Sequence, residues 1–198
     1  MYKDAPMDTL KDLRKSCKER NIPIISTPTE RFLHKLLLAY KPDVVLELWW
    51  AVGYSGISMA KKLQRRWGTI YSFEISYPAY RESLQHANTD QIFNLISYPY
   101  NCLHVALEKL LPKKKVDFVF IDAQKAQYGA YLAKIENIIH DKTVIIIDDV
   151  IKYHHKLTSL YRYLSKKQIK CNGKNGRTYT ILPLDSDDGI MIIQNIQK

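Results

Sequence analysis

The sequence predicts a single α/β domain with a doubly wound, mostly parallel, Rossmann-like sheet of seven strands. Three observations support this fold class. Five short apolar runs rich in β-branched residues alternate with stretches of helical periodicity, the order typical of a parallel sheet covered on both faces. The chain then ends in two apolar runs around a turn-rich segment, which predicts an antiparallel hairpin. At 198 residues and 46% hydrophobic content, the chain has the size of one well-buried domain.

Residues 1–40 are expected to form two leading helices. Apolar residues recur there at helical spacing in two groups, Met7, Leu10, Leu13 and Cys17, and then Phe32, Leu33, Leu36 and Leu37. Thr29, or Thr27 before Pro28, is expected to cap the start of the second helix. The sheet core follows over residues 43–198, so that residues 1–198 form one unit.

The parallel strands are expected at the five apolar runs, 44–48, 69–73, 92–96, 116–121 and 144–147. Right-handed helical crossovers should connect them. The closing hairpin should pair 178–182 with 190–193 across the turn at 185–189. Ligands of open sheets of this kind bind beyond the carboxyl ends of the strands, so the functional residues are expected at that edge.

The formal net charge is +10 and the pI is near 9.4, with basic clusters at 61–66, 113–115 and 166–177. Such a surface attracts polyanions such as RNA, although solvated helix ends and loops give the same pattern. No apolar run approaches the roughly 20 residues of a membrane span, and the first residues lack a signal-peptide pattern. Three scattered cysteines favour neither a disulfide framework nor a zinc site. These features predict a cytoplasmic protein.

Carboxylates lie at the ends of four predicted strands: Glu47, Glu74, Asp122, and the pair Asp148 and Asp149. An unpaired buried carboxylate costs several kcal/mol, so each should meet a cation or water. One such acid can simply cap a helix or be solvated. Three at adjacent strand ends, Asp122, Asp148 and Asp149, would repel one another unless a positive group lay between them.

A hard divalent cation is the natural partner for three such carboxylates, because oxygen ligands suit Mg²⁺ or Ca²⁺. Lys125 follows Asp122 by three residues and is expected at the same crevice. There it would accept or steer a hydroxyl proton, provided that burial and neighbouring cations depress its pKa. The alternative for Lys125 is a surface lysine at the start of a helix.

Four segments carry a family resemblance. Residues 44–48 running into Gly53, Tyr54 and Ser55 resemble the first strand and cofactor loop of the catechol and caffeoyl-CoA type O-methyltransferases. Residues 120–128 and 147–150 are similar to the fourth-strand and fifth-strand motifs of that family. The closing Leu-Pro-Leu and Asp-Gly segments resemble its last hairpin, so the likeness extends from about residue 22 to the end.

The resemblance implies a class I methyltransferase that transfers the methyl group of S-adenosylmethionine (SAM) to a hydroxyl oxygen with the help of Mg²⁺ or another divalent cation. It implies that Asp122, Asp148 and Asp149 hold the metal, and that Lys125 is the general base. Asp122 would be catalytic and also adjoin the cofactor. The implied SAM contacts are Glu47, Gly53, Tyr54 and Ser55 at the methionine part, Glu74 at the ribose, and Asn101 and Cys102 near adenine. A homodimer is implied as well.

The sequence departs from the family pattern in the cofactor loop. Trp49 and Trp50 occupy positions where the family has glycine and a small residue, which let the backbone approach the ligand. Asp149 replaces the usual Asn, and Asp141 with Lys142 replaces a Gly-Gly pair. A catalytically silent binding module with the methyltransferase fold is therefore an alternative to the enzyme.

The acceptor has two alternatives. Residues 21–24 and 51–55 resemble the bacterial branch that methylates 5-hydroxyuridine at the tRNA wobble position, and the basic surface agrees with a tRNA substrate. The other acceptor is a small catechol or hydroxycinnamoyl compound. Salt should separate the two, because binding of tRNA weakens steeply with ionic strength and binding of a small phenol does not.

Overall fold

The computed structural model describes residues 9–49, 51–66, 68–112, 115–173, 176–186 and 188–196. Met7 of the first predicted helix and Trp50 of the cofactor loop lie outside the described residues. So do Lys113 and Lys114 of the second basic cluster.

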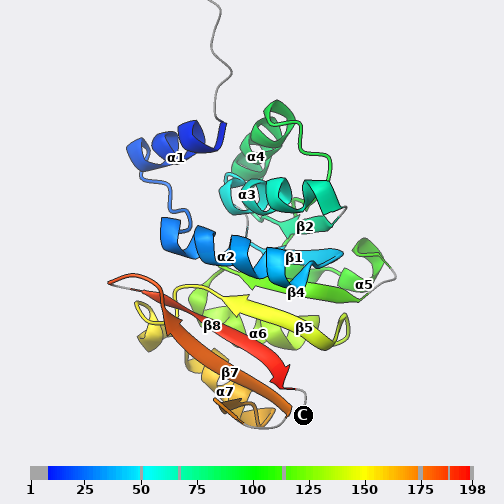
Figure 1. Ribbon diagram of the computed structural model, residues 1–198, viewed down its shortest axis with the longest axis vertical. Helices are drawn as coiled ribbons and strands as arrows, with labels where there is room; N and C mark the ends of the chain where they lie inside the picture. The colour runs from blue at the N-terminus through cyan, green and yellow to red at the C-terminus, as the bar shows by residue number, and fades with distance from the viewer. Residues whose placement is uncertain are drawn as a thin grey trace, which may run out of the picture.

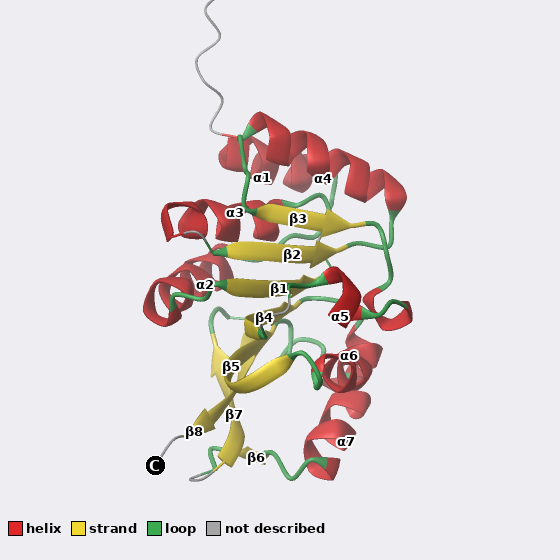
Figure 2. Cartoon of the chain, turned by 90° about the vertical axis from the view of Figure 1, so that its right-hand side faces the viewer, coloured by secondary structure: helices red, strands yellow, loops and turns green. Residues whose placement is uncertain are grey.

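A mostly parallel sheet forms the centre of the molecule (Figures 1 and 2). Its order is β3-β2-β1-β4-β5-β8-β7-β6. The strands are β1 (Val44–Leu48), β2 (Thr69–Phe73), β3 (Leu95–Tyr98), β4 (Val116–Ile121), β5 (Ile139–Ile147), β6 (Lys170–Cys171), β7 (Gly176–Pro183) and β8 (Gly189–Ile196). Strands β1 to β5 run parallel, whereas β8 is antiparallel to both β5 and β7. The predicted fold class and closing hairpin are confirmed.

The sheet differs from the prediction in the number and bounds of its strands. It has eight described strands rather than seven, because residues 170–171 add a two-residue strand beside β7. The third strand begins at Leu95 rather than residue 92, and Ile92 is instead a buried loop residue after the preceding helix. Strand β5 begins five residues before the predicted 144, and residues 139–142 are exposed or only partly buried and lack a continuous apolar run.

Helices cover both faces of the sheet. They are α1 (Thr9–Glu19), α2 (Thr27–Tyr40), α3 (Tyr54–Leu63), α4 (Tyr77–Thr89), α5 (Leu107–Leu110), α6 (Tyr128–Ile135) and α7 (Thr158–Lys166). Helices α1 to α4 share one apolar core with the sheet, and α5 to α7 share the other; Figure 2 shows α2 and α3 opposite α6. None of the described helices is long and apolar enough to cross a membrane.

The start of α2 corrects one prediction. Its N-cap is Ser26, whose Oγ accepts a hydrogen bond from the Thr29 amide at 3.1 Å, and neither Thr27 nor Thr29 is the cap. Pro28 lies in the first turn, as expected. The cap matters for the site because Ser26 and Thr29 both line the cavity described below.

Candidate functional site

The predicted acids are placed by the sheet itself. The amide of Asp122 donates to the carbonyl of Leu48 at the end of β1, at 3.2 Å. The amide of Asp148 donates to the carbonyl of Ile121 at the end of β4, at 3.0 Å. These bonds continue the strand ladders by one residue, so the carboxylates that follow β4 and β5 meet at one edge of the sheet.

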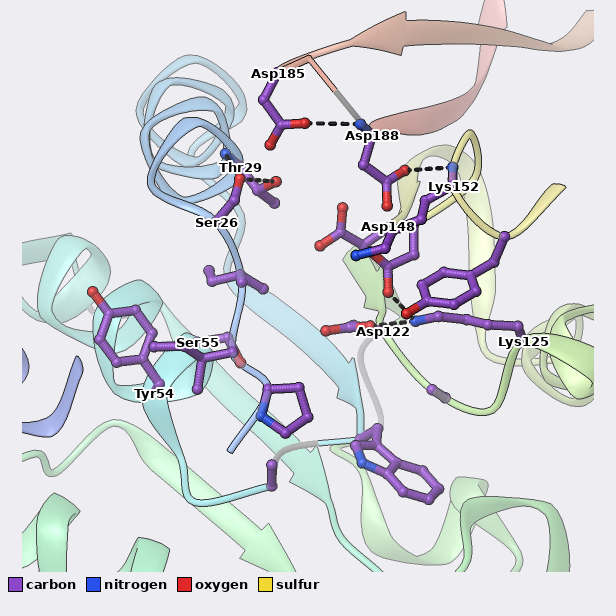
Figure 3. A pocket seen from close by; sticks show the side chains of 18 of the residues that line it. Ser26, Thr29, Tyr54, Ser55, Asp122, Lys125, Asp148, Lys152, Asp185 and Asp188 are labelled. Carbon is purple, nitrogen blue, oxygen red and sulfur yellow. Dashed lines mark hydrogen bonds and ion pairs between the residues drawn. The ribbon is translucent and has the colours of Figure 1, made fainter. Parts of the chain in front are cut away.

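A cavity of about 720 Å³ lies at this edge (Figure 3). Its wall combines the segment between α1 and α2, the loop after β1, the ends of β4 and β5, and the β7–β8 turn. The lining residues are Pro23, Ile24, Ile25, Ser26, Thr29, Trp49, Ala51, Tyr54, Ser55, Asp122, Ala123, Gln124, Lys125, Asp148, Asp149, Lys152, Tyr153, Asp185, Ser186 and Asp188.

Lys125 bridges two of the acids. Its Nζ lies 2.7 Å from Asp122 Oδ1 and 2.6 Å from Asp149 Oδ2. Burial alone would lower the pKa of Lys125, but the negative charges of Asp122 and Asp149 raise this pKa well above its ordinary value. Lys125 therefore carries its proton in this arrangement, whereas the base role inferred from the sequence requires a depressed pKa.

Burial raises the pKa of both fifth-strand acids. Burial, and then the charges of Asp122 and Asp149, raise the pKa of Asp148 well above its ordinary value. Burial and a hydrogen bond with Asp188 raise the pKa of Asp149 to about 6. Among the described lining residues there are five aspartates and two lysines, so the cavity is acidic although the protein as a whole is strongly basic.

The donor chemistry of the site suits a hard divalent cation, because Asp122, Asp148 and Asp149 offer only carboxylate oxygens. Within the described residues, however, no three His, Cys, Asp or Glu side chains are already grouped as a metal site. The Lys125 ammonium lies between Asp122 and Asp149 instead. A cation at these carboxylates would have to compete with Lys125.

Glu47 lies beneath the cavity, where it is completely buried. One carboxylate oxygen accepts the Ser55 hydroxyl at 2.5 Å, and the other accepts the Ser72 hydroxyl. Burial raises the pKa of Glu47 to about 7, despite these two hydrogen bonds. Glu47 thus acts on the cavity through Ser55, which lines it, rather than by facing it.

Glu74 connects two loops. Its Oε2 accepts the Ala51 amide at 2.7 Å and its Oε1 accepts the Ser76 amide at 2.6 Å, so it holds the loops after β1 and β2 together. Cys102 is buried and begins a short 3₁₀ turn that Asn101 caps. Of the described predicted cofactor residues, Tyr54, Ser55 and Asp122 line the cavity, whereas Glu47, Gly53, Glu74, Asn101 and Cys102 do not.

Trp49 has a backbone conformation that favours glycine. Its φ is 79°, in the left-handed region, and its amide donates to the Phe73 carbonyl at 3.1 Å. The partly buried indole packs against the core shared with α5 to α7, and it also borders the cavity. The loop after β1 therefore keeps its left-handed backbone conformation at this position although the residue has a large side chain.

Sequence reasoning missed the rim of the cavity. Asp188 Oδ1 accepts the amides of Ile151 and Lys152, both at 3.2 Å, and so fixes the segment after β5 at the mouth. Figure 3 shows the Lys152 side chain extending toward the acids. Tyr153 lies beside three ammonium groups, with Lys156 Nζ 5.2 Å from its ring centre. The Asp188-Gly189 pair of the last hairpin is a recognisable sequence signal. No spacing rule, however, predicts that Asp188 contacts residue 152.

Comparisons with known proteins place the chain in a family. The family model described as O-methyltransferase matches residues 3–174. A curated relative, tapetum-specific methyltransferase 1 of Arabidopsis thaliana, is 25% identical over 150 residues, covering 73% of this chain. The aligned part spans 64% of that relative's length.

Solved structures have the same fold. TomG of Streptomyces achromogenes, an O-methyltransferase of tomaymycin synthesis solved with SAM, superposes with a TM-score of 0.81 at 18% identity, covering 96% of this chain and 91% of TomG. An O-methyltransferase of Bacillus cereus in complex with SAH gives a TM-score of 0.77 at 20% identity, covering 98% and 93%. With the family model matching most of the chain, this protein belongs to the O-methyltransferase family.

Proposed function

We propose that the protein transfers the methyl group of SAM to a hydroxyl oxygen. The observation that carries the proposal is the convergence of Asp122, Lys125, Asp148 and Asp149 beside the loop after β1, in a chain of the O-methyltransferase family. In the reaction the acceptor oxygen loses its proton and attacks the methyl carbon. The carbon–sulfur bond breaks, which leaves a methyl ether and S-adenosylhomocysteine.

On the cofactor side, the buried acids set the polarity of the groups that would face SAM. Because the Ser55 hydroxyl donates to Glu47, its oxygen is left as an acceptor toward the cavity, suited to the ammonium of the methionine part. Glu74 does not line the cavity, but its oxygens keep lone pairs besides those that accept two loop amides, and these lone pairs are proposed to accept ribose hydroxyls. Asn101 and Cys102 are proposed to adjoin the adenine.

On the acceptor side, Asp122, Asp148 and Asp149 are proposed to hold Mg²⁺ or another divalent cation, which would lower the pKa of the acceptor hydroxyl. Lys125 is proposed to take the hydroxyl proton. This role requires Asp122 and Asp149 to release the ammonium, because their charges otherwise keep the pKa of Lys125 high. Without that release, Lys125 would stay protonated and only orient the oxygen.

A specific observation favours RNA as the acceptor, with the tRNA wobble 5-hydroxyuridine as the proposed target. Residues 151–177 contain eight Lys or Arg and no Asp or Glu. This acid-free segment begins at the cavity rim, where Lys152 and Tyr153 line the mouth. Phosphates held along it would bring a nucleobase to the cavity.

A small catechol or hydroxycinnamoyl acceptor is the second candidate. It is favoured by the apolar wall of Pro23, Ile24 and Ile25, which suits a planar aromatic ring. TomG, which has the same fold, is an O-methyltransferase involved in tomaymycin synthesis. The acidic lining, by contrast, gives no advantage to an anionic thioester carrier.

Methyl transfer from labelled SAM tests the proposal. Hypomodified tRNA and 3,4-dihydroxybenzoate are offered separately, with Mg²⁺ or with a chelator. We expect label in one of them, loss of transfer on chelation, and a loss of about a hundredfold or more in Asp122→Asn. Glu136→Gln, which breaks an exposed ion pair with Lys167 away from the cavity, is the matched control and should retain activity. Transfer that persists in Asp122→Asn would contradict the proposed role of this site.

A further inference from the structure

A polar cluster connects the two leading helices to the start of α3, on the far side of the cavity wall from the acids. Arg14 of α1 is its centre. Its Nε donates to the Tyr54 hydroxyl at 2.9 Å, Nη1 donates to the Ile25 carbonyl at 3.1 Å, and Nη2 lies 3.0 Å from Glu30 Oε2. The guanidinium also lies over the Tyr54 ring, 4.4 Å from its centre.

Glu30 of α2 completes this Arg14 cluster. Its carboxylate accepts the Tyr54 hydroxyl at 3.0 Å and the Ser58 hydroxyl at 2.5 Å, in addition to the Arg14 pair. Burial would raise the pKa of Glu30, but these hydrogen bonds outweigh burial and lower it. Burial, and then the charge of Glu30, raise the pKa of Tyr54 to about 12, so Tyr54 stays protonated and able to donate.

The Arg14 cluster joins two parts of the cavity wall that belong to different ligands in the proposed reaction. Tyr54 is the first residue of α3 and directly follows the loop after β1, on the SAM side. Ile25 belongs to the connection between α1 and α2, the apolar wall on the acceptor side. Figure 3 shows the Tyr54 ring directed away from Asp122 and Lys125, so its hydroxyl is used in the cluster and not in the acidic centre.

We propose that Arg14, Glu30 and Tyr54 are positioning residues that hold the acceptor wall in register with the cofactor loop, so that SAM binding at the loop is transmitted to the wall. The inference rests on the proposed function, because it assigns one ligand to each side. One guanidinium fixes a wall carbonyl, a helix carboxylate and the Tyr54 hydroxyl at once. A change in the loop therefore reaches the wall through three directional bonds, not through packing alone.

The chain contains a matched control just after the same helix. Arg20 directly follows α1 and forms a bidentate ion pair with Glu82 of α4, with its Nη2 2.9 Å from Glu82 Oε2. This pair ties the end of α1 to a neighbouring helix, but neither residue lines the cavity among the residues described. Arg20→Gln thus removes a charge and an ion pair at the end of α1 without touching the wall.

Hydrogen–deuterium exchange with and without saturating SAM is the test. In the parent protein we expect slower exchange both in residues 47–58, on the cofactor side, and in residues 22–30, on the wall. In Arg14→Gln the slowing over 47–58 should persist. Residues 22–30 of this variant, with SAM bound, should exchange about tenfold faster than the same residues of the parent. Arg20→Gln should behave as the parent. Arg14→Lys keeps the charge but lacks the planar guanidinium, whose three nitrogens reach three separate acceptors. It should lose the wall response too, which covers the case in which Arg14→Gln folds poorly.

The outcomes separate the two proposals. Two results would overturn the inference while leaving SAM binding intact. One is that SAM slows exchange in the parent only over residues 47–58. The other is that SAM slows exchange over residues 22–30 equally in the parent and in Arg14→Lys. No slowing at 47–58 in the parent would contradict the proposed function, and the inference would fall with it. As a kinetic check, Arg14→Lys should raise the acceptor KM by about tenfold while the Kd for SAM changes less than about twofold.

Discussion

At the scale of single residues, Trp49 decides how the cofactor loop can work. A left-handed φ costs a non-glycine residue roughly 1 kcal/mol, and here it is adopted by tryptophan. The contact of the indole with the core offsets part of this cost. The left-handed backbone conformation of Trp49 keeps the loop after β1 in position. The indole side chain of Trp49, by contrast, fills space beside the cavity.

Two substitutions separate the backbone effect from the side-chain effect. Trp49→Gly and Trp49→Ala both remove the indole, but only glycine tolerates a φ of 79° without strain. We expect the glycine variant to be more stable than the alanine variant by about 1 kcal/mol in urea unfolding, against the usual order of these residues. Equal stability, or a more stable alanine variant, would show that the loop does not hold this conformation in solution.

Glu47 predicts a pH dependence of stability. Its pKa in the folded protein is about 7, above the ordinary 4.5, so the folded state binds this proton more tightly than the unfolded state does. The contribution of Glu47 is therefore complete below pH 4.5 and is lost as the pH rises through about 7. Glu47→Gln stays neutral, and at pH 8 it should be more stable than the parent, by at most about 3 kcal/mol.

Urea unfolding at pH 5 and pH 8 checks this expectation. The exposed Glu108→Gln is the control and should show the same change between the two pH values as the parent. If Glu47→Gln also shows the parent's change, Glu47 titrates in the folded protein as it does in water, and its burial between Ser55 and Ser72 would be wrong.

The residues of the site could be predicted from the sequence where the chain order determines them. A parallel sheet places the carboxyl ends of its strands at one edge. Once the strands were identified, Asp122 and Asp148 were therefore predicted to lie at the same edge. The partners could not be predicted. Lys125 pairs with both Asp122 and Asp149, and Glu47 accepts hydrogen bonds from two serines. These contacts depend on proximity in three dimensions, which no periodicity in the sequence encodes.

At the scale of elements, the start of α2 positions the acceptor wall. Ser26 accepts the Thr29 amide, whereas Ser76, the N-cap of α4, makes no side-chain capping bond. Ser26→Ala should therefore lower the free energy of unfolding by about 1 kcal/mol, and Ser76→Ala should change it by less than half as much. Thermal or urea unfolding of both variants measures the difference; equal losses would mean that the Ser26 bond contributes nothing.

Element bounds were predicted best where burial is complete. Strands β1, β2 and β4 match their apolar runs because they are central or nearly so, with most side chains buried. The first half of β5 and the two-residue β6 were missed, since exposed strand residues carry no apolar pattern. The α2 cap was misplaced because residues 26, 27 and 29 all have hydroxyl side chains, and only the backbone geometry distinguishes them.

At the scale of the whole molecule, charge is segregated. The cavity lining is acidic, while residues 151–177, a segment that begins at the cavity rim, are basic without any acid. An RNA acceptor would be held by that segment, so its affinity should fall at least a hundredfold or so between about 50 and 200 mM salt. Filter binding of hypomodified tRNA at several salt concentrations measures this fall.

Charge reversal locates the binding surface. Arg162→Glu with Lys166→Glu should weaken tRNA binding and flatten its salt dependence, because both side chains are exposed on α7. Lys18→Glu with Lys35→Glu makes the same change in net charge on the leading helices and should weaken binding much less. Equal losses in the two double variants would indicate only a net-charge effect and would favour the small-molecule acceptor.

The most direct test of the account is a calorimetric titration of the protein with SAM, with and without Mg²⁺. We expect saturable binding to one site per chain, with a Kd on the order of micromolar, because Trp49 has a left-handed backbone conformation in the loop after β1 and Ser55 lines the cavity. An absence of binding at millimolar SAM to the folded protein would contradict this. Trp49 would then block the cofactor space, and the chain would be a methyltransferase fold without methyltransferase chemistry.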